Sequence, residues 1–244
     1  MEQTIIKKEP LGKGFFVNVT KHHTFGTDAI LLADFAHAKK SDLFLDLGTG
    51  CGIIPLILLR DGLLKSAVGV DISHEACMLC NKTIKELALQ NFSVIEGNLT
   101  NLSGKTEFGV YNLITCNPPY KAPGAGIKNP DAVKSVARHE VECSLEDIVK
   151  TAARLLQTSG RFCVCHRPER LAELLDLMRL YKLEPKRLRC VTQRLGQKPW
   201  LVLVEAKKCA NTGLIIEPEL YIEQDGNFSE EMLKIYSVYK EAYL

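Results

Sequence analysis

LFLDLGTGCG occupies residues 43–52 and joins an apolar run to three alternating glycines. The apolar run predicts a buried strand over 43–48, and IIPLILLRDGLL, which follows the glycines, predicts the start of a helix. Gly48, Gly50 and Gly52 permit a sharp turn between the two, because a residue without a Cβ adopts backbone conformations closed to other residues. A strand, a glycine loop and a helix in this order form the repeating unit of an α/β fold.

Strand and helix patterns alternate along the rest of the chain. Apolar runs predict further strands over 67–72, 92–97, 111–116 and 161–166. Helical patterns occur in HEACMLCNKTIKELAL, in SLEDIVKTAARLL, which Ser144 opens with Asp147 in the capping-box position, and in PERLAELLDLMRLY. Residues 187–195 and 199–208 look like a closing antiparallel pair. We therefore expect a mostly parallel sheet with helices on both faces, in one domain over 1–244 with a short strand-rich extension over 1–25.

Composition points to a globular protein without membrane spans. The chain has 244 residues, of which 46% are hydrophobic and 25% charged. Its longest strongly apolar stretch, Gly52 to Leu59, is far shorter than the ~20 residues that a membrane span needs, and the N-terminus lacks the apolar part of a secretory signal. Nine scattered cysteines favour reduced thiols in the cytoplasm. Cys77 and Cys80 have no partner pair at zinc-ribbon spacing, so we expect them to face the core and expect no metal site.

The spacing of the glycine loop bears on its ligand. GxGxG is tighter than the GxGxxG of dinucleotide enzymes and is less suited to a pyrophosphate. Asp71 ends the second strand, where a carboxylate can accept both ribose hydroxyls of an adenosine. Asp46, just before the loop, can hold an ammonium group. An adenosine with an amino acid favours S-adenosylmethionine over NAD, although a glycine turn without a ligand, or an Asp71 that only caps a helix, stays open.

NPPY, residues 117–120, follows the predicted strand over 111–116. Neither proline has an N–H to give, so the strand ends here in a loop of fixed shape. The side-chain oxygen of Asn117 and the carbonyl of Pro118 can converge on one flat –NH2 group, and Tyr120 offers a face on which a planar base can stack. A purely structural turn is the alternative. NPPY beside the glycine loop favours methyl transfer to an amine.

DLGTGCG followed by NPPY resembles the class I S-adenosylmethionine-dependent N-methyltransferases. TFGTDAILLADFA, VARHEVECSLEDIVKTAARLL and DGNFSEEMLKIYSVYKEAYL extend the likeness over nearly the whole chain. With them, the chain is similar to the bacterial tRNA(Val) adenine-37 N6-methyltransferase family. The resemblance implies a Rossmann-like seven-stranded sheet whose last strand is antiparallel. It also implies methylation of the exocyclic N6 amine of the adenine beside the anticodon.

The resemblance also implies roles for individual residues. Asn117, Pro118 and Tyr120 would be the catalytic residues, with Asn117 also beside the donor. Asn98, where an aspartate is commoner, would contact the adenine of the donor and can still accept a hydrogen bond through its side-chain carbonyl. Thr27 and Asp28 would open a helix near the methionine end of the donor or simply cap that helix. The full set of expected donor contacts is Thr27, Asp28, Asp46, Gly48, Thr49, Gly50, Gly52, Asp71, Ile72, Asn98, Leu99 and Asn117.

The near-neutral net charge of +2 conceals two oppositely charged blocks. Residues 179–208 carry nine Lys or Arg against two acids, and residues 217–231 carry six acids and no base. The basic block could hold RNA phosphates or could be a solvated face. The residues expected to contact the substrate are Pro119, Tyr120, Lys121, Arg138, Lys186, Arg187, Arg189 and Arg194. We expect the anticodon loop of a tRNA as partner, a monomer, and structural roles for His139 and His166.

Other functions compete with this one. A methyltransferase acting on a glutamine amide of a protein such as a release factor also uses NPPY, but about 45 residues ahead of the glycine loop leave little room for its usual helical recognition domain. A DNA adenine methyltransferase would normally add a target-recognition domain. A non-catalytic RNA-binding protein would have no need of an intact glycine loop together with an intact NPPY.

Overall fold

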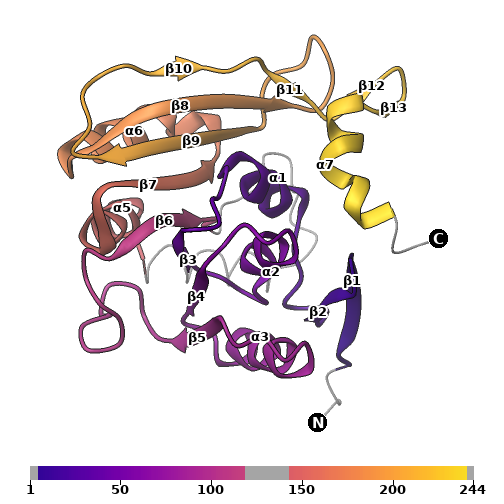
Figure 1. Ribbon diagram of the computed structural model, residues 1–244. Coiled ribbons are helices and arrows are strands. Elements are labelled where there is room, and N and C mark those ends of the chain that lie inside the picture. The colour runs from indigo at the N-terminus through magenta and orange to yellow at the C-terminus, as the bar shows by residue number, and fades with distance from the viewer. Residues whose placement is uncertain (1–4, 119–142, 241–244) are drawn as a thin grey trace.

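The computed structural model of the protein describes residues 5–118 and 143–240. Within them, one sheet runs in the order β5, β4, β3, β6, β7, β9, β8, and two very short strands pair with the outer edge of β8 (Figure 1). Neighbouring strands from β5 to β7 are parallel, and β9 is antiparallel to both β7 and β8. The bounds are β3 Leu43–Leu47, β4 Ser66–Asp71, β5 Phe92–Glu96, β6 Tyr111–Cys116, β7 Leu156–His166, β8 Leu183–Thr192, β9 Leu201–Lys208, β10 Ile215–Ile216 and β11 Leu220–Tyr221.

This architecture confirms the predicted fold. The seven long strands make a mostly parallel sheet, and the last of them in the chain, β9, is the antiparallel one. The predicted closing pair is the antiparallel β8–β9 pair. The sequence does not predict β10 and β11, because strands of two residues are too short to carry a periodic pattern.

Helices cover both faces of the sheet (Figure 1). Side chains of α1 Thr27–Phe35, α2 Ile53–Arg60 and α3 His74–Glu86 share one apolar core, which also receives Phe44 of β3. Side chains of α5 Leu145–Leu155 and α6 Leu171–Leu180 share a second core, which receives Leu45 and Leu47 of the same strand. Adjacent side chains of a strand point to opposite faces, so β3 must be apolar on both, as its sequence is.

The ends of helices and strands follow the local sequence, except at the start of α6 and at the start of β7. Ser144 caps α5, and its side chain and that of Asp147 form the predicted capping box. The helix expected from Pro168 begins instead as a 3₁₀ turn, η1 Pro168–Arg170, which precedes α6. Strand β7 begins five residues before the predicted 161, because Leu156 pairs with Tyr111 of β6 ahead of a register shift in the ladder.

Both ends of the described chain pack onto the α1 side of the molecule (Figure 1). The predicted strand-rich extension is a hairpin of β1 Lys7–Gly12 and β2 Phe15–Val19. The C-terminal segment forms a second hairpin, β12 Glu223–Gln224 with β13 Asn227–Phe228, and then α7 Glu230–Lys240. Helix α7 contacts α1 and β1, and the Tyr236 hydroxyl donates a hydrogen bond of 3.0 Å to Thr27 Oγ1.

The cysteines of α3 face the core as expected. Cys77 and Cys80 are 3% and 0% exposed, and burial raises the pKa of the Cys77 thiol to about 11. Residues 5–118 and 143–240 contain no group of three His, Cys, Asp or Glu side chains placed to hold a metal ion. In the same residues, every helix is too short or too polar to cross a bilayer.

Candidate active site

Two adjoining cavities lie at the carboxyl ends of the parallel strands, the edge where α/β folds bind ligands. The first has a volume of about 280 Å³ and is lined by residues that follow β3, β4, β5 and β6. The second has a volume of about 290 Å³ and lies between the glycine loop and the start of α1. Gly48, Asn117 and Pro118 line both cavities. The glycine loop and the start of NPPY therefore meet at one point.

The glycine loop is fixed by backbone hydrogen bonds and open toward the cavities. The amides of Gly48 and Thr49 donate to the carbonyl of Val70 on β4, at 2.8 and 2.9 Å. Gly48 and Gly50 have positive φ values of +71° and +56°, and a Cβ built on either meets no atom within 4 Å. A ligand can therefore approach the backbone at these two positions.

Gly52 has a different reason to be glycine. Its φ is +85°, and a Cβ there would lie 2.7 Å from the sulfur of Cys80. Gly52 lines neither cavity. It lets the start of α2 pack closely against α3, and its predicted contact with the donor stays a prediction.

Asp71 ties the loop to the next helix and still faces the first cavity. One carboxylate oxygen accepts from the Gly50 amide at 2.7 Å, and the other accepts from the Ser73 amide at 2.8 Å. Ser73, not Asp71, caps α3, because its hydroxyl accepts from Ala76. A carboxylate has about four lone-pair sites, so Asp71 keeps capacity for a ligand after these two bonds. Ile72 lines the same cavity, beside it.

Asp46 is a buried carboxyl at the second cavity. It is 1% exposed, and Thr115 Oγ1 donates to it at 2.6 Å. Burial raises the pKa of Asp46 to about 7, because the charged form loses its hydration, while the hydrogen bond from Thr115 opposes the shift. A cation in the cavity would favour the ionised form, as expected for a group that holds an ammonium.

Asn98 presents a different group from the one expected. Its side-chain oxygen already accepts two hydrogen bonds, from the amide of Thr100 at 2.9 Å and from its hydroxyl at 2.8 Å. A carbonyl oxygen has two lone pairs, so the Asn98 NH2 is the part left for a ligand. Asn98 and Leu99 line the first cavity.

Thr27 and Asp28, both predicted to contact the donor at the start of α1, differ in their surroundings. The helix does begin at Thr27, with Gly26 as its N-cap, and the Asp28 carboxylate accepts from the first-turn amide of Ala29 at 2.9 Å. Thr27 accepts a hydrogen bond from Tyr236 and lines neither cavity, whereas Asp28 lines the second. Thr27 therefore does not cap the helix, whereas Asp28 bonds a first-turn amide without standing at the N-cap position.

Asn117 and Pro118 follow β6 and stand where the cavities join. The thiol of Cys165 on β7 donates to Asn117 Oδ1 at 3.0 Å. The sequence does not single out Cys165, since only the strand register brings it beside Asn117. Other residues predicted for the site lie outside the described residues. These are Pro119, Tyr120, Lys121, Arg138 and His139.

His166 lines the first cavity at the end of β7. Its Nδ1 accepts from the Arg167 amide at 2.8 Å, so the neutral ring carries its proton on Nε2. Burial lowers the pKa of His166 below its ordinary value. The ring therefore stays neutral at neutral pH and can donate one hydrogen bond from Nε2.

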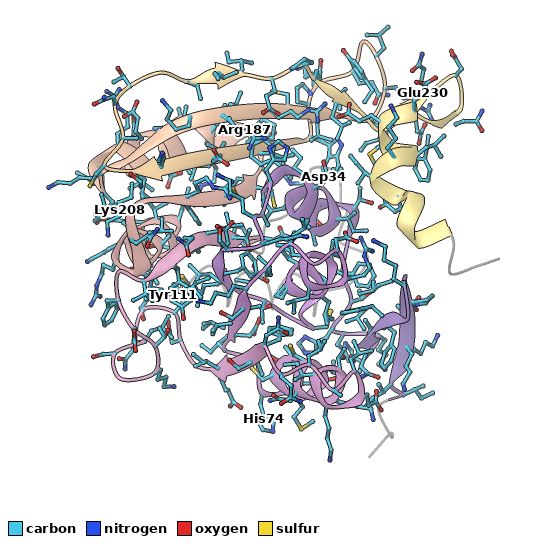
Figure 2. The ribbon with its side chains drawn as sticks, viewed as in Figure 1. Asp34, His74, Tyr111, Arg187, Lys208 and Glu230 are labelled. Atoms are coloured by element: carbon cyan, nitrogen blue, oxygen red, sulfur yellow. The ribbon has the colours of Figure 1, made fainter. Side chains whose placement is uncertain are left out.

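Basic residues on β8 and just after it form ion pairs with the acidic block, residues 217–231. Arg187 lies in the layer between β8 and α1 (Figure 2), and its guanidinium contacts Glu205 and Glu217 at 3.1 and 2.6 Å. Arg189 pairs with Glu231, Arg194 pairs with Glu223, and Lys186 donates to the Asn211 carbonyl. None of these four bases lines either cavity. Their predicted contacts with RNA would compete with the pairs that they already make.

Comparison with known proteins identifies the family. Residues 19–180 match the methyltransferase small domain family. The chain belongs to this family. It is 29% identical over 208 residues to a tRNA1(Val) (adenine(37)-N6)-methyltransferase of Parabacteroides distasonis, a match that covers 82% of this chain and 86% of that relative. It is 25% identical to a protein of the same name from Bacteroides fragilis, over 86% of this chain and 87% of the relative.

Solved structures show the same fold. A predicted O-methyltransferase of Agrobacterium tumefaciens superposes with a TM-score of 0.70 and 18% identity, over 87% of this chain and 97% of that one. A geranyl diphosphate C-methyltransferase of Streptomyces coelicolor, solved with S-adenosyl-L-homocysteine, gives a TM-score of 0.54 and 15% identity, over 74% and 79% of the two chains. The protein is an S-adenosylmethionine-dependent methyltransferase with the class I fold, as the sequence predicts.

Proposed function

We propose that the protein transfers a methyl group from S-adenosylmethionine to the exocyclic N6 amine of an adenine in tRNA, at position 37 beside the anticodon. The observation that carries the proposal is the place of Asn117 and Pro118 at the junction of the two cavities. Two hydrogen-bond acceptors at this junction, the Asn117 side-chain oxygen and the Pro118 carbonyl, would hold an amine next to the glycine loop, where we place the methyl donor. The names of the relatives, which cover most of the chain, support the choice of tRNA and of the nucleotide.

The residues around the two cavities fit the cofactor. The first cavity would take the adenosine, with Asp71 on the ribose and the Asn98 NH2 donating to a ring nitrogen, between Ile72 and Leu99. The second would take the amino-acid end, with its ammonium facing Asp46 and Asp28. The open backbone of Gly48 lies between them. When bound, S-adenosylmethionine supplies an electrophilic methyl group on a sulfonium.

Asn117 and Pro118 would prepare the amine. An exocyclic amine of adenine is a poor nucleophile, because its lone pair is delocalised into the ring. Two acceptors, the Asn117 side-chain oxygen and the Pro118 carbonyl, each take one N–H and favour a pyramidal nitrogen with a localised lone pair. The fixed position of both acceptors adds a proximity effect. The nitrogen can release its proton to water after transfer, so His166 need not act as a base.

The target base must leave the stack of the anticodon loop to reach Asn117. Tyr120 would then stack on it, and Lys121 and Arg138 would line the entrance. The basic residues on β8 and just after it are weaker candidates for phosphate contacts, because RNA would have to displace Glu217 from Arg187 and Glu223 from Arg194.

Product analysis tests the proposal. The protein is incubated with labelled S-adenosylmethionine and, in separate reactions, with tRNA, DNA or a release factor, and the labelled product is identified after digestion. N6-methyladenosine from tRNA is expected, and a transcript with guanosine at position 37 should stay unlabelled. N5-methylglutamine from the release factor would refute the proposal, as would label confined to DNA.

A further inference from the structure

We infer that Cys165 is a positioning residue, which holds the Asn117 amide in the orientation that presents its oxygen to the target amine. The inference rests on the proposed function, since it assigns Asn117 Oδ1 as an acceptor of that amine. It concerns a contact between two strands that the position of NPPY alone does not reveal.

The register of the sheet places the two side chains together. Asn117 follows Cys116, whose partner on the neighbouring strand β7 is Val164, so the next residue of β7, Cys165, stands level with Asn117. The Cys165 sulfur donates to Asn117 Oδ1 at 3.0 Å, and Cys165 is 0% exposed. Little water can compete for the Asn117 oxygen on this side.

A donor at this position selects one of two amide orientations. Rotation of the Asn117 amide by 180° would exchange its oxygen with its NH2, and an NH2 cannot accept a hydrogen bond from an amine. A thiol that faces Oδ1 favours the orientation with the oxygen in place. The oxygen has two lone pairs, so one remains for the substrate. A thiol is also a weak donor, so it orients the oxygen without strongly reducing its power to accept.

Cys163 supplies a matched control. It lies two residues earlier on β7, so its side chain points to the same face, and it is also 0% exposed. Its sulfur contacts Glu205 Oε2 at 3.7 Å rather than Asn117. Cys165→Ala and Cys163→Ala therefore remove the same volume from the same strand, and only the first removes a donor to Asn117.

Kinetics with tRNA give the first readout. One neutral hydrogen bond shifts an equilibrium by about threefold to tenfold, so Cys165→Ala should lower kcat by about that factor and leave the KM for S-adenosylmethionine unchanged. Cys165→Ser, which keeps a donor, should recover most of the kcat, and Cys163→Ala should behave as wild type. Equal kcat in the two alanine variants, or a serine variant no better than Cys165→Ala, would overturn the inference.

Nuclear magnetic resonance gives a readout that needs no substrate. The side-chain NH2 signals of Asn117 are assigned as those lost in Asn117→Ala. In Cys165→Ala they should shift or broaden through exchange between two orientations, and in Cys163→Ala they should stay in place. Unchanged signals in Cys165→Ala would refute the positioning role, whereas a wild-type protein that methylates no tRNA would refute the proposed function instead.

Discussion

Replacing Gly48 by alanine should separate donor binding from the stability of the fold. Gly48 has a φ of +71°, and a Cβ added there meets no protein atom within 4 Å. The substitution therefore introduces backbone strain and one methyl group in the space that the two cavities share, but no clash. An alanine in the left-handed region costs about 1–2 kcal/mol of folding free energy. In a chain of this size that cost lowers Tm by about 2–8 °C.

Gly62→Ala is the matched control. Gly62 has a φ of +65°, also meets no atom within 4 Å when a Cβ is added, and lines neither cavity. Both variants should lose a similar free energy of unfolding, since both place alanine in the same backbone region. Only Gly48→Ala should lose affinity for S-adenosylhomocysteine, by about tenfold or more, because its methyl group occupies ligand space at the backbone.

Two measurements decide the outcome. Thermal denaturation of the ligand-free variants gives the two Tm values, and isothermal titration calorimetry with S-adenosylhomocysteine, without tRNA, gives the two affinities. Equal affinities in Gly48→Ala and Gly62→Ala would show that the ligand does not approach the backbone of Gly48, which would refute the placement of the cofactor. If Gly48→Ala lowered Tm much more than Gly62→Ala, the added methyl group would have to clash with the protein. That result would contradict the open space found around Gly48.

Three further outcomes are expected. Asn117→Ala should lower kcat by a factor on the order of 100 or more while calorimetry still detects donor binding, and loss of that binding would contradict the division of roles. Burial raises the pKa of Asp46 from 3.8 in the unfolded chain to about 7. The carboxyl therefore ionises more readily in the unfolded chain, and the free energy of unfolding falls as the pH rises between these values. Asp46→Asn should remove this pH dependence of stability, measured by urea unfolding at about pH 5 and about pH 8. A variant with the same pH profile as wild type would show that Asp46 is not its source. Arg187→Met should cost about 1–3 kcal/mol in urea unfolding, because the buried Glu205 loses one of its two arginine partners and keeps only Arg161. Arg194→Ala, at an exposed pair, should cost less than about 1 kcal/mol, and similar losses would show that burial of the pair does not matter.

The fold was accessible from the sequence because its parallel strands are apolar on both faces. LFLDL and YNLITC are mostly apolar, and each is followed by a turn signal, a glycine in the first case and Asn-Pro in the second. This pattern marks a strand buried between two helical layers. The start of β7 was not accessible, because Gln157, Thr158 and Ser159 are polar and only Leu156 of this segment pairs with the neighbouring strand. Sequence patterns report burial, and an exposed extension of a ladder leaves no such pattern.

At the site, the residue types were predictable but their partners were not. The engagement of the Asn98 oxygen by Thr100 has a local signal, since an asparagine often bonds the backbone two residues on. The contact from Cys165 to Asn117 joins residues that lie 48 positions apart in the sequence. The pairing of Arg187 with Glu217 joins the basic and acidic blocks across 30 residues. These contacts depend on strand register and on the path of the C-terminal segment, which local patterns do not encode.

The acidic C-terminal segment also has a consequence for solubility. Strand β8 is the last long strand on its side of the sheet, and an uncovered outer strand offers its backbone donors and acceptors to any other chain. Strands β10 and β11 occupy part of that edge, and each is only two residues long, so neither offers a long template in turn. The segment therefore protects the sheet against fibril-like pairing between copies.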